Sequence, residues 1–296
     1  MISIIITSFK ESKTIGRAIE SFILQNIKEN FEMYVVSPDN ETINIAKKYK
    51  KKHKQIKIFK DPGKGKLYAL NLILPKLKGR IIILSDGDVY VSKNSADEIL
   101  RFFKNAKIGC VSGRPVPIEG KKTKYGYWAN FLFEAAHKLR KESSEKNNFI
   151  ECSGYLFAFR ADNKLKIPLD TAEDAMIPYY FFENGYKIGY AENAKVYVKN
   201  ADNWNDWIKQ KVRTAKAHET LNKYVDTKTT SRLKSFKKEA LGGIKPIFYY
   251  PKNFNERIWT LELCFARLYM WLKVIFLVKF KRIGSVDNWE RIESAR

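Results

Sequence analysis

The chain has 296 residues, which suffice for one large domain or for one domain with an appended segment. Hydrophobic residues make up 45% of it and aromatic residues 14%, which excludes a wholly disordered chain because this content can form a packed core. The formal net charge of +23 favours a polyanionic partner such as nucleic acid, anionic lipid or a phosphorylated substrate, unless it reflects the charged surface of a thermophile.

Cysteine usage and the N-terminal residues favour an intracellular protein. The three cysteines, Cys110, Cys152 and Cys264, are odd in number, lie far apart and form no CxxC pair. We therefore predict neither a disulfide framework nor a thiolate zinc site, and a reducing, cytoplasmic compartment fits best. Met1 leads directly into the apolar run Ile2–Ile6 without a basic region, which favours a strand over a signal peptide.

The first 115 residues alternate between short apolar runs and helix-length segments. Strands are expected at Ile2–Thr7, Met33–Ser37, Ile56–Phe59, Ile81–Ser85 and Ile108–Val111. Between them, Ser12–Asn26 carries apolar residues at helical spacing, and Asn40 and Asn94 or Ser95 are the expected N-caps of later helices. The alternation predicts a parallel sheet covered on both faces, in which ligands bind beyond the carboxyl ends of the strands.

After Pro117 the pattern is less regular. Helices are expected at Tyr125–Lys141, Ala172–Asn184 and Asp202–Tyr224, and strands at Tyr155–Arg160, Tyr186–Tyr190 and Lys195–Val198. The helix over Asp202–Tyr224 is strongly basic. Lys228–Lys238 is a polar, cationic stretch that we interpret as a linker or a surface strip.

The segment Ile258–Phe280 is almost wholly apolar but contains four charged residues. Each charge at a bilayer centre costs roughly 2.5–3.5 kcal/mol, so we do not expect this segment to span a membrane. A helix that lies in the membrane interface is the first interpretation. Packing against the rest of the fold is the second, because the charges do not fall on a single helical stripe.

The strand Ile81–Ser85 runs into two carboxylates separated by one glycine, Asp86-Gly87-Asp88. Strand alternation places both carboxylates on the same side, and Gly87 lets the backbone come close to a ligand. Two carboxylates so close together are costly unless a cation neutralises them. The pattern predicts a Mg²⁺ or Mn²⁺ site shared with a diphosphate, with an ordinary Asp-Gly turn as the alternative.

A glycine-rich segment, Asp61–Lys66, precedes a predicted helix that contains Asn71. Backbone N–H groups at such a helix start, with Lys64 or Lys66 nearby, favour a phosphate-bearing ligand. The spacing of a Walker A loop is absent. The alternative is a solvated turn.

Two further polar pairs lie in the second half of the chain. Glu173 and Asp174 begin a predicted helix, where one of them could act as a general base towards an attacking hydroxyl, or where both could simply complement the helix dipole. Gln210 and Arg213 are three residues apart on the basic helix and share a face. That face could hold a diphosphate, or it could be a solvated cationic surface.

In chain order these pieces resemble the inverting glycosyltransferase family 2, of GT-A fold, over about residues 1–215. The matching segments are Thr7–Glu11, Gly65–Asn71, Asp86 with Asp88, Ser153–Tyr155 with Phe159 and Arg160, Ala172–Asp174, and Gly185–Tyr190. The resemblance implies an α/β fold of GT-A type, with a Rossmann-like, mostly parallel sheet flanked by helices. It implies a catalytic domain over residues 1–224. Residues 225–296 would form a basic linker and an apolar helical extension that is a candidate for membrane association.

The resemblance also implies roles for individual residues. Asp88 would ligate Mg²⁺ or Mn²⁺, Asp86 would orient the donor ribose or the water shell of the metal, and Asp174, beside Glu173, would be the catalytic base. The implied donor contacts are Thr7, Ser8, Glu11, Asp39, Lys66, Asn71, Asp86, Gln210 and Arg213. The implied acceptor-side residues are Ser153, Gly154 and Tyr155. One base and one displacement at C1 of the sugar imply inversion.

Three positions depart from the family pattern. Ser37-Pro38-Asp39 stands where paired acidic residues are common, so Asp39 alone is the expected contact to the nucleoside. Gln210–Thr214 lacks the tryptophan of processive members, whose multiple membrane spans are also missing, so we expect a non-processive enzyme. Lys199 and Asn200 stand where some members have a metal-binding histidine, so the metal would depend on Asp88, the diphosphate and water. His53, His137 and His218 are interpreted as surface or packing residues.

We therefore expect a hexosyltransferase that uses a nucleoside-diphosphate sugar, with a UDP-sugar favoured over a GDP-sugar. The expected acceptor is a hydroxyl or phosphate of a polyprenyl-linked or surface glycan precursor, met at an anionic membrane surface on the cytoplasmic face of the cell membrane. A nucleotidyltransferase is one alternative, although its phosphate loop normally follows the first strand. A nucleic-acid-binding module is another, but carboxylates clustered at strand ends repel phosphates, so we do not expect nucleic acid as a partner.

Overall fold

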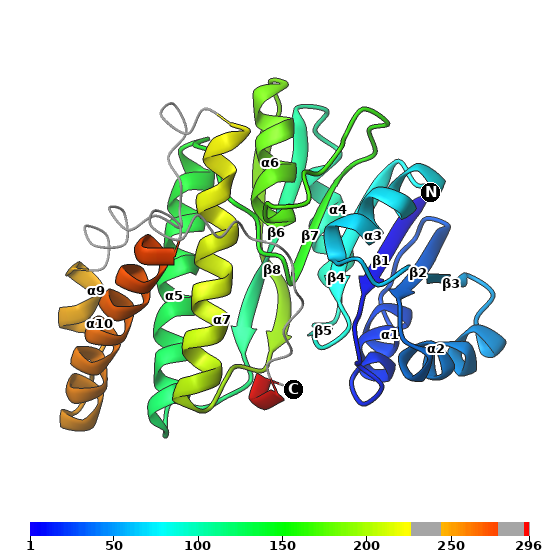
Figure 1. Cartoon of the computed structure of the whole chain (residues 1–296). Coiled ribbons are helices and arrows are strands. Elements are labelled where there is room, and N and C mark those ends of the chain that lie inside the picture. Colours follow the sequence, from blue (N-terminus) through cyan, green and yellow to red (C-terminus); the bar gives the residue numbers. More distant parts are fainter. Residues whose placement is uncertain (226–243, 278–292, 296) are drawn as a thin grey trace. The chain divides into compact units, whose positions relative to one another are not determined.

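The computed structural model describes residues 1–225, 244–277 and 293–295, so the cationic stretch Lys228–Lys238 lies outside the described residues (Figure 1). The elements in chain order are β1 (Ile2–Thr7), α1 (Ile15–Ile23), β2 (Phe31–Ser37), α2 (Asn40–Lys52), β3 (Ile56–Lys60), α3 (Lys66–Ile73), η1 (Leu74–Lys76), β4 (Ile81–Asp86), β5 (Tyr90–Val91), α4 (Ser95–Phe102), β6 (Ile108–Pro117), α5 (Lys124–Glu145), β7 (Leu156–Arg160), α6 (Glu173–Glu183), β8 (Lys187–Val198), α7 (Trp204–Glu219), η2 (Thr220–Lys223), α9 (Ile244–Tyr249), α10 (Phe254–Ile275) and η4 (Glu293–Ala295).

Contacts along the chain define two compact units. The first unit comprises Met1–Pro115, Glu151–Leu169 and Glu173–Val198. The second unit comprises Val116–Ile150, Asp170–Ala172 and the described part of Lys199–Arg296. Residues 1–224, the expected catalytic domain, contribute to both units.

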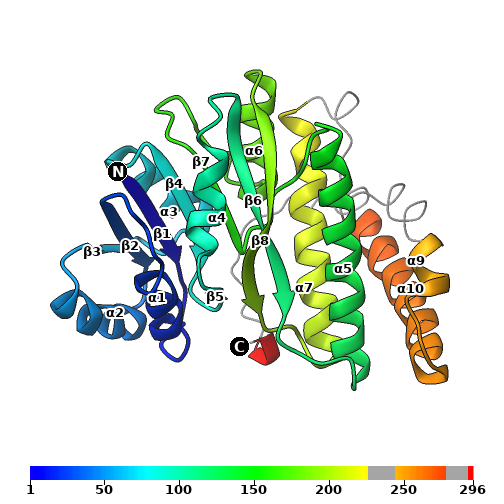
Figure 2. The ribbon, with the colours of Figure 1, turned by 180° about the vertical axis from the view of Figure 1, so that it is seen from behind.

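The first unit is built on an eight-stranded sheet in the order β3-β2-β1-β4-β7-β6-β8-β5 (Figure 2). Strands β3, β2, β1 and β4 pair in parallel, while β7 is antiparallel to both β4 and β6. The expected α/β architecture, a sheet flanked by helices, is confirmed. Strand β4 therefore has a parallel neighbour, β1, on one side and an antiparallel neighbour, β7, on the other.

The apolar runs explain why these strands lie in the middle of the unit. All six residues of β1 are buried, as are five of the six in β4, because helices cover both faces of a parallel sheet. The stripe expected on the first helix is confirmed, since α1 buries Ile15, Ala18, Ile19 and Phe22. The helix is shorter than Ser12–Asn26, because residues 12–14 form a turn.

Several expected boundaries were wrong. The N-cap of α2 is Asp39 rather than Asn40, because the Asp39 carboxylate accepts a hydrogen bond from the Thr42 N–H at 2.8 Å. The two strands expected at the end of the unit are one twelve-residue strand, β8. The two-residue strand β5 pairs with β8 and was not predicted, because so short a segment carries no periodicity.

Glu32 is a buried carboxylate that ties together the amino-terminal side of the sheet. It accepts hydrogen bonds from the Ser3 hydroxyl, the Lys57 ammonium and the Lys78 N–H, each at 2.7 Å. Burial alone would raise the pKa of Glu32, but the bonds from Lys57, Lys78 and Ser3 outweigh it and hold that pKa below its usual value of 4.5. The carboxylate is therefore charged and stabilising at neutral pH.

Glu32→Gln is expected to lower the free energy of unfolding by about 2–3 kcal/mol at neutral pH, because a hydrogen-bonded charge is lost. Since the folded pKa of Glu32 is depressed, its contribution is complete above pH 4.5 and is lost as the pH falls through the folded pKa. Urea unfolding of both proteins along an acid series should show their difference shrinking below that pH. A difference that widens towards acid pH would contradict this account.

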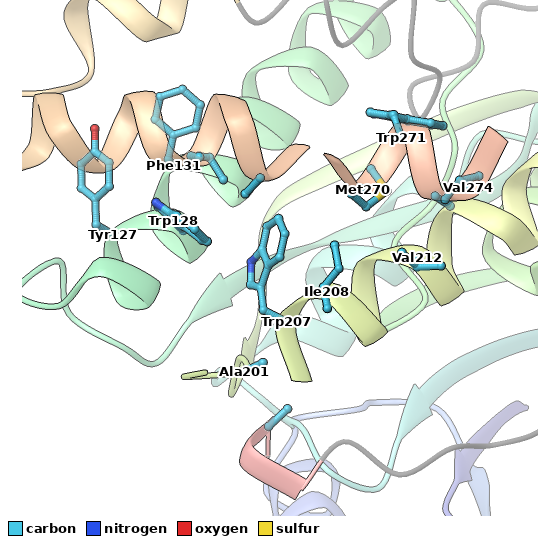
Figure 3. Close-up of a cluster of buried hydrophobic side chains, with 14 residues drawn as sticks. Tyr127, Trp128, Phe131, Ala201, Trp207, Ile208, Val212, Met270, Trp271 and Val274 are labelled. Atoms are coloured by element: carbon cyan, nitrogen blue, oxygen red, sulfur yellow. The ribbon is translucent and has the colours of Figure 1, made fainter. Parts of the chain in front are cut away.

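The second unit is held together by an aromatic and aliphatic cluster between α5, α7 and α10 (Figure 3). The Trp128 and Trp207 rings meet edge to face with their centroids 5.1 Å apart. The Trp128 indole N–H donates to the Trp259 carbonyl at 2.7 Å, and the Tyr127 hydroxyl lies 2.7 Å from that of Thr260. These bonds satisfy the polar atoms that the cluster buries. Within the described part of the chain, no helix combines the length and the hydropathy that crossing a membrane requires.

Candidate active site

The carboxyl ends of β1 and β4 lie side by side in the first unit. Thr7 and Asp86 are register partners, and the Thr7 hydroxyl donates to Asp86 Oδ1 at 2.9 Å. The Gly87 N–H donates to the Thr7 carbonyl at 2.8 Å, and the Ser8 N–H donates to the Val36 carbonyl at the end of β2 at 2.9 Å. The structure thus brings the ends of three parallel strands together, where ligands bind in such sheets.

Gly87 allows the Asp86–Asp88 turn to pack directly on Ser8. A Cβ atom at Gly87 would lie 2.6 Å from the Ser8 Cβ and 3.3 Å from Ile15 Cδ1. Such contacts are too short to tolerate, so the turn requires glycine. The close approach that the sequence predicted for Gly87 is present, but towards the chain itself.

Gly87→Ala is expected to push the Asp86–Asp88 turn away from Ser8 and to lower the free energy of unfolding by about 1–3 kcal/mol. Thermal unfolding of both proteins measures the loss of stability. The rise in unfolding temperature on adding Mn²⁺ and a nucleotide sugar, expected to be smaller in the variant, measures whether Asp86 and Asp88 have moved. Gly120→Ala is the matched control, because a Cβ there would meet no atom within 4 Å. Equal behaviour of the two variants would show that the turn can shift without cost.

Lys66 forms a buried ion-pair network with two carboxylates from distant parts of the chain. It is the first residue of α3, directly after Gly65, whose φ of +100° favours glycine. Its Nζ lies 2.7 Å from Asp86 Oδ1 and 2.5 Å from Glu173 Oε1. Burial alone would lower the pKa of Lys66, but the charges of Asp86 and Glu173 outweigh it and raise that pKa. Lys66 is therefore firmly protonated.

Glu173 has the opposite balance. Burial raises the pKa of its carboxyl group, Lys66 lowers it, and the neighbouring charges of Asp174 and Asp86 raise it again, with a net increase above the usual 4.5. Its side chain is 13% exposed. Burial and the charges of Asp174 and Asp86 thus outweigh the single lysine, and Glu173 is more readily protonated than an ordinary glutamate.

Asp174, the second residue of α6, lies beside the segment Ser153–Tyr155. A Cβ atom built on Gly154 would lie 3.5 Å from Asp174 Oδ2, an ordinary van der Waals distance, so Gly154 lies directly beside the carboxylate. The Ser85 hydroxyl donates to the Tyr155 carbonyl at 2.8 Å, which fixes the segment to the end of β4. The expected base and the expected acceptor-side residues are therefore neighbours.

A proline in α6 makes this contact possible. In an uninterrupted helix the Asp174 carbonyl would accept the N–H of residue 178. That residue is Pro178, which has no N–H. The Asp174 carbonyl instead accepts the N–H of Cys152 at 2.9 Å. Because the helix offers it no donor, the Asp174 carbonyl holds Cys152, two residues before Gly154.

Asp39 and Glu11, both expected donor contacts, lie between β1, β2 and α2. Asp39 accepts from the N–H of Lys10 at 2.6 Å as well as from Thr42, and the Glu11 N–H donates to the Thr42 hydroxyl at 2.9 Å. Burial would raise the pKa of Asp39, but the bonds from Thr42, Lys10 and Ser37 lower it overall. Asp39 is thus a charged cap that shapes the loop after β1, and its contact to a donor stays a prediction.

The other expected donor residues are placed differently. The Asn71 amide donates to the Ile167 carbonyl at 2.7 Å and accepts from the Ile167 N–H at 3.0 Å, so it ties α3 to the loop before α6. Gln210 and Arg213 belong to the second unit, on α7, where Arg213 is exposed. Their donor contacts, and that of Asn71, stay predictions.

The acidic turn suits a metal held jointly with a diphosphate. Within residues 1–225, 244–277 and 293–295, no group of three or more His, Cys, Asp or Glu side chains could hold a metal ion. Mg²⁺ and Mn²⁺ need no such group, because they are commonly bound by one or two carboxylates together with phosphate oxygens and water. Asp86 and Asp88 meet that requirement. The Thr7 and Lys66 bonds both reach Oδ1 of Asp86.

A model of the family described as Glycosyl transferase family 2 matches residues 3–164, more than half of the chain. The chain belongs to glycosyl transferase family 2. It is therefore a nucleotide-sugar glycosyltransferase. The matched residues include the ends of β1, β2 and β4, the Asp86–Asp88 turn and the segment Ser153–Tyr155. No curated protein matches the sequence.

Solved structures support the GT-A fold of this family 2 member. The mannosyltransferase PcManGT from Pyrobaculum calidifontis, in complex with GDP-Man and Mn²⁺, is 14% identical with a TM-score of 0.59, and the match covers 93% of this chain and 87% of that one. TarS 1–349 from S. aureus, in complex with UDP-GlcNAc, is 17% identical with a TM-score of 0.51, and the match covers 95% and 91%.

Proposed function

We propose that this family 2 enzyme transfers one sugar from a nucleoside-diphosphate sugar to an acceptor, with inversion at C1 and without processive elongation. The observation that carries the proposal is the position of Asp174. It lies directly beside Gly154 and next to Glu173, which Lys66 joins to Asp86. A carboxylate beside the expected acceptor-side residues would serve as the base, and the acidic turn at the end of β4 would hold the donor diphosphate through a metal ion.

In the proposed reaction, Asp174 accepts the proton of an acceptor hydroxyl. The hydroxyl oxygen forms a bond to C1 of the sugar from the face opposite the diphosphate, and the bond between C1 and the diphosphate oxygen breaks. Lys66 keeps Glu173 and Asp86 in place by its two short ion pairs, and Thr7 fixes the same oxygen of Asp86. Glu173 serves as a positioning residue, because its ion pair with Lys66 fixes the start of α6 next to Asp174.

We propose that Asp88 and Asp86 hold Mg²⁺ or Mn²⁺ together with the donor diphosphate. Such an ion supplies charge stabilisation for the departing nucleoside diphosphate. The donor set fits, because the turn offers two carboxylates whose charge would otherwise repel a diphosphate. PcManGT, which shares the fold, is described with Mn²⁺ and GDP-Man, and TarS with UDP-GlcNAc. We favour a UDP-sugar as the donor here, with a GDP-sugar as the second choice.

The proposed acceptor is a hydroxyl or phosphate group of a polyprenyl-linked or surface glycan precursor. The net charge of +23 favours work at an anionic surface, and we place the enzyme at the cytoplasmic face of the cell membrane as a peripheral protein. A hexose is the proposed sugar.

A thermal-shift screen of UDP-, GDP-, CMP- and dTDP-sugars, each with and without Mn²⁺, tests this function. One nucleotide family should stabilise the protein in a Mn²⁺-dependent way, by about 2.7 kcal/mol at a hundredfold excess over Kd. Asp88→Asn should lose the Mn²⁺ dependence, whereas Asp97→Asn, which removes a half-buried carboxylate paired with Arg101, should keep it. If no nucleotide sugar stabilises the protein and it binds DNA only at low salt, the polyanion-binding alternative replaces this proposal.

A further inference from the structure

Helix α10 has two unlike sides within the second unit. One side is buried against α5 and α7 through Leu263, Ala266, Met270 and Val274. The opposite side carries large apolar residues that are exposed, with Phe254 75% and Phe265 71% accessible. We call six of these residues the outer stripe: Phe254, Leu261, Phe265, Leu268, Leu272 and Phe276.

The spacing of the outer stripe places its members on one side of the helix. Successive members are seven, four, three, four and four residues apart, which is the repeat of a single helical face. A helix of 22 residues is about 33 Å long. Monomeric soluble proteins rarely expose so long a contiguous apolar surface, so the outer stripe indicates a contact with another apolar phase or partner.

Charged residues lie at the edges of the outer stripe and not within it. Arg257 and Lys273 are exposed on its two flanks, and neither forms an ion pair with a described residue. The acidic residue on a flank, Glu262, lies 3.6 Å from the Lys124 ammonium. The edges therefore present positive charge. An apolar face with cationic edges is the arrangement of a helix that lies in the interface of an anionic bilayer.

The sequence before α9 and after α10 has a net positive charge, like the edges of the outer stripe. Residues 226–243 contain five Lys or Arg and two acidic residues, and residues 278–292 contain four and two. Lys279, Lys281 and Arg282 follow within seven residues of the end of α10. Basic residues next to an interfacial helix each contribute about 1 kcal/mol of attraction to anionic lipid.

Helix α9 extends the same interpretation. It is joined to α10 by Tyr250–Asn253, and the two helices lie side by side in both views (Figure 1, Figure 2). Its Phe248 and Tyr249 are 77% and 65% exposed. Aromatic side chains are enriched at the level of lipid headgroups, where one end of the ring is apolar and the other wet. Exposed aromatic residues next to the outer stripe are therefore suited to that environment.

We propose that the outer stripe of α10 docks on an anionic lipid bilayer, with the helix parallel to the surface and Arg257 and Lys273 at headgroup level. The inference rests on the proposed function and names the surface by which the enzyme reaches a lipid-linked acceptor. A second copy of the chain fits this face less well, because two such faces would bring their cationic edges together in a protein of net charge +23.

Vesicle co-sedimentation tests the docking surface on the full chain. Wild type should bind vesicles of phosphatidylcholine with phosphatidylglycerol, should bind pure phosphatidylcholine weakly, and should be released as salt is raised. The triple variant Leu261→Ser, Phe265→Ser, Leu272→Ser should bind the anionic vesicles at least about tenfold more weakly, since the apolar area is lost. Leu24→Ser with Leu169→Ser is the matched control, because both residues are exposed leucines of the first unit.

The donor-induced thermal shift is measured on the same proteins. If wild type ignores anionic vesicles, or if the triple variant binds them as wild type does, the docking proposal is wrong. A change of oligomeric state in the triple variant without vesicle binding by wild type would assign the outer stripe to a second copy and would overturn the proposal as well. If the docking proposal fails but the donor still raises the unfolding temperature, the proposed function stands. If the protein binds vesicles but no donor raises its unfolding temperature, only the proposed function is overturned.

Discussion

The Asp174→Asn variant is expected to fold, to bind the donor as wild type does, and to lose sugar transfer by about 10²–10⁴-fold. Asparagine keeps the shape of the side chain beside Gly154 but cannot accept the acceptor proton, and a general base contributes a factor of that size. The bond that places the residue runs from the Cys152 N–H to the backbone carbonyl, so it survives the change. Transfer rates and the donor-induced thermal shift, measured together, check the expectation.

Asp162→Asn is the control for this experiment, because it removes an exposed carboxylate of the same unit that bonds to Tyr180 and to the Lys164 N–H. It should leave transfer within about twofold of wild type, since surface substitutions have small effects. Near-normal transfer by Asp174→Asn would remove Asp174 from the role of base. Loss of both transfer and donor binding would instead make it a residue of donor recognition.

Replacing Lys66 by Met is expected to cost about 3–5 kcal/mol of unfolding free energy, because two half-buried carboxylates lose the buried cation between them. Asp86 and Glu173 would then repel each other and Asp174. Since Glu173 already has a raised pKa, it can escape by taking up a proton, and the folded form gains from that as the pH falls. The stability deficit of Lys66→Met, measured by urea unfolding, should therefore be larger at pH 8 than at pH 5.

Two further variants separate this explanation from a loss of packing. Lys66→Met combined with Glu173→Gln should recover a large part of the stability, because one of the stranded charges is gone. Lys64→Met, on the same loop but exposed, should be nearly neutral. If the double variant is no more stable than Lys66→Met, the ion pairs are not what Lys66 contributes. An effect of Lys64→Met as large as that of Lys66→Met would point to the loop as a whole.

The parallel half of the sheet could be predicted because its strands are buried on both faces. Such strands are continuous apolar runs, so β1 and β4 stand out in the sequence, and the polar residues that follow them mark the strand ends. The Asp86–Asp88 turn was predicted in this way, whereas the helix starts at Lys66 and Glu173 were predicted from the glycine-rich turn and from the helical pattern. The meeting of Thr7 with Asp86 follows from the parallel pairing of β1 with β4.

Contacts between distant segments could not be predicted from the sequence. Nothing local indicates that Lys66 meets Glu173 across 107 residues, so this ion pair was not predicted, and the phosphate contact suggested for Lys66 stays a prediction. The same holds for Asn71, whose amide is bound to Ile167. The hydrophobic pattern of β7 shows that it is a strand but not in which direction it runs, so its antiparallel pairing with β4 could not be predicted. In α10, the outward apolar side became visible only when the buried side was known.

The proline of α6 has a consequence for attempts to stabilise this enzyme. Alanine at residue 178 would restore the missing N–H and is preferred over proline in a helix by about 3 kcal/mol. A library selected by unfolding temperature alone should therefore enrich Pro178→Ala. The new N–H would compete with Cys152 for the Asp174 carbonyl and would release the Gly154 segment from the base. Selection for heat resistance would thus favour alanine at residue 178, whereas selection for turnover would favour proline.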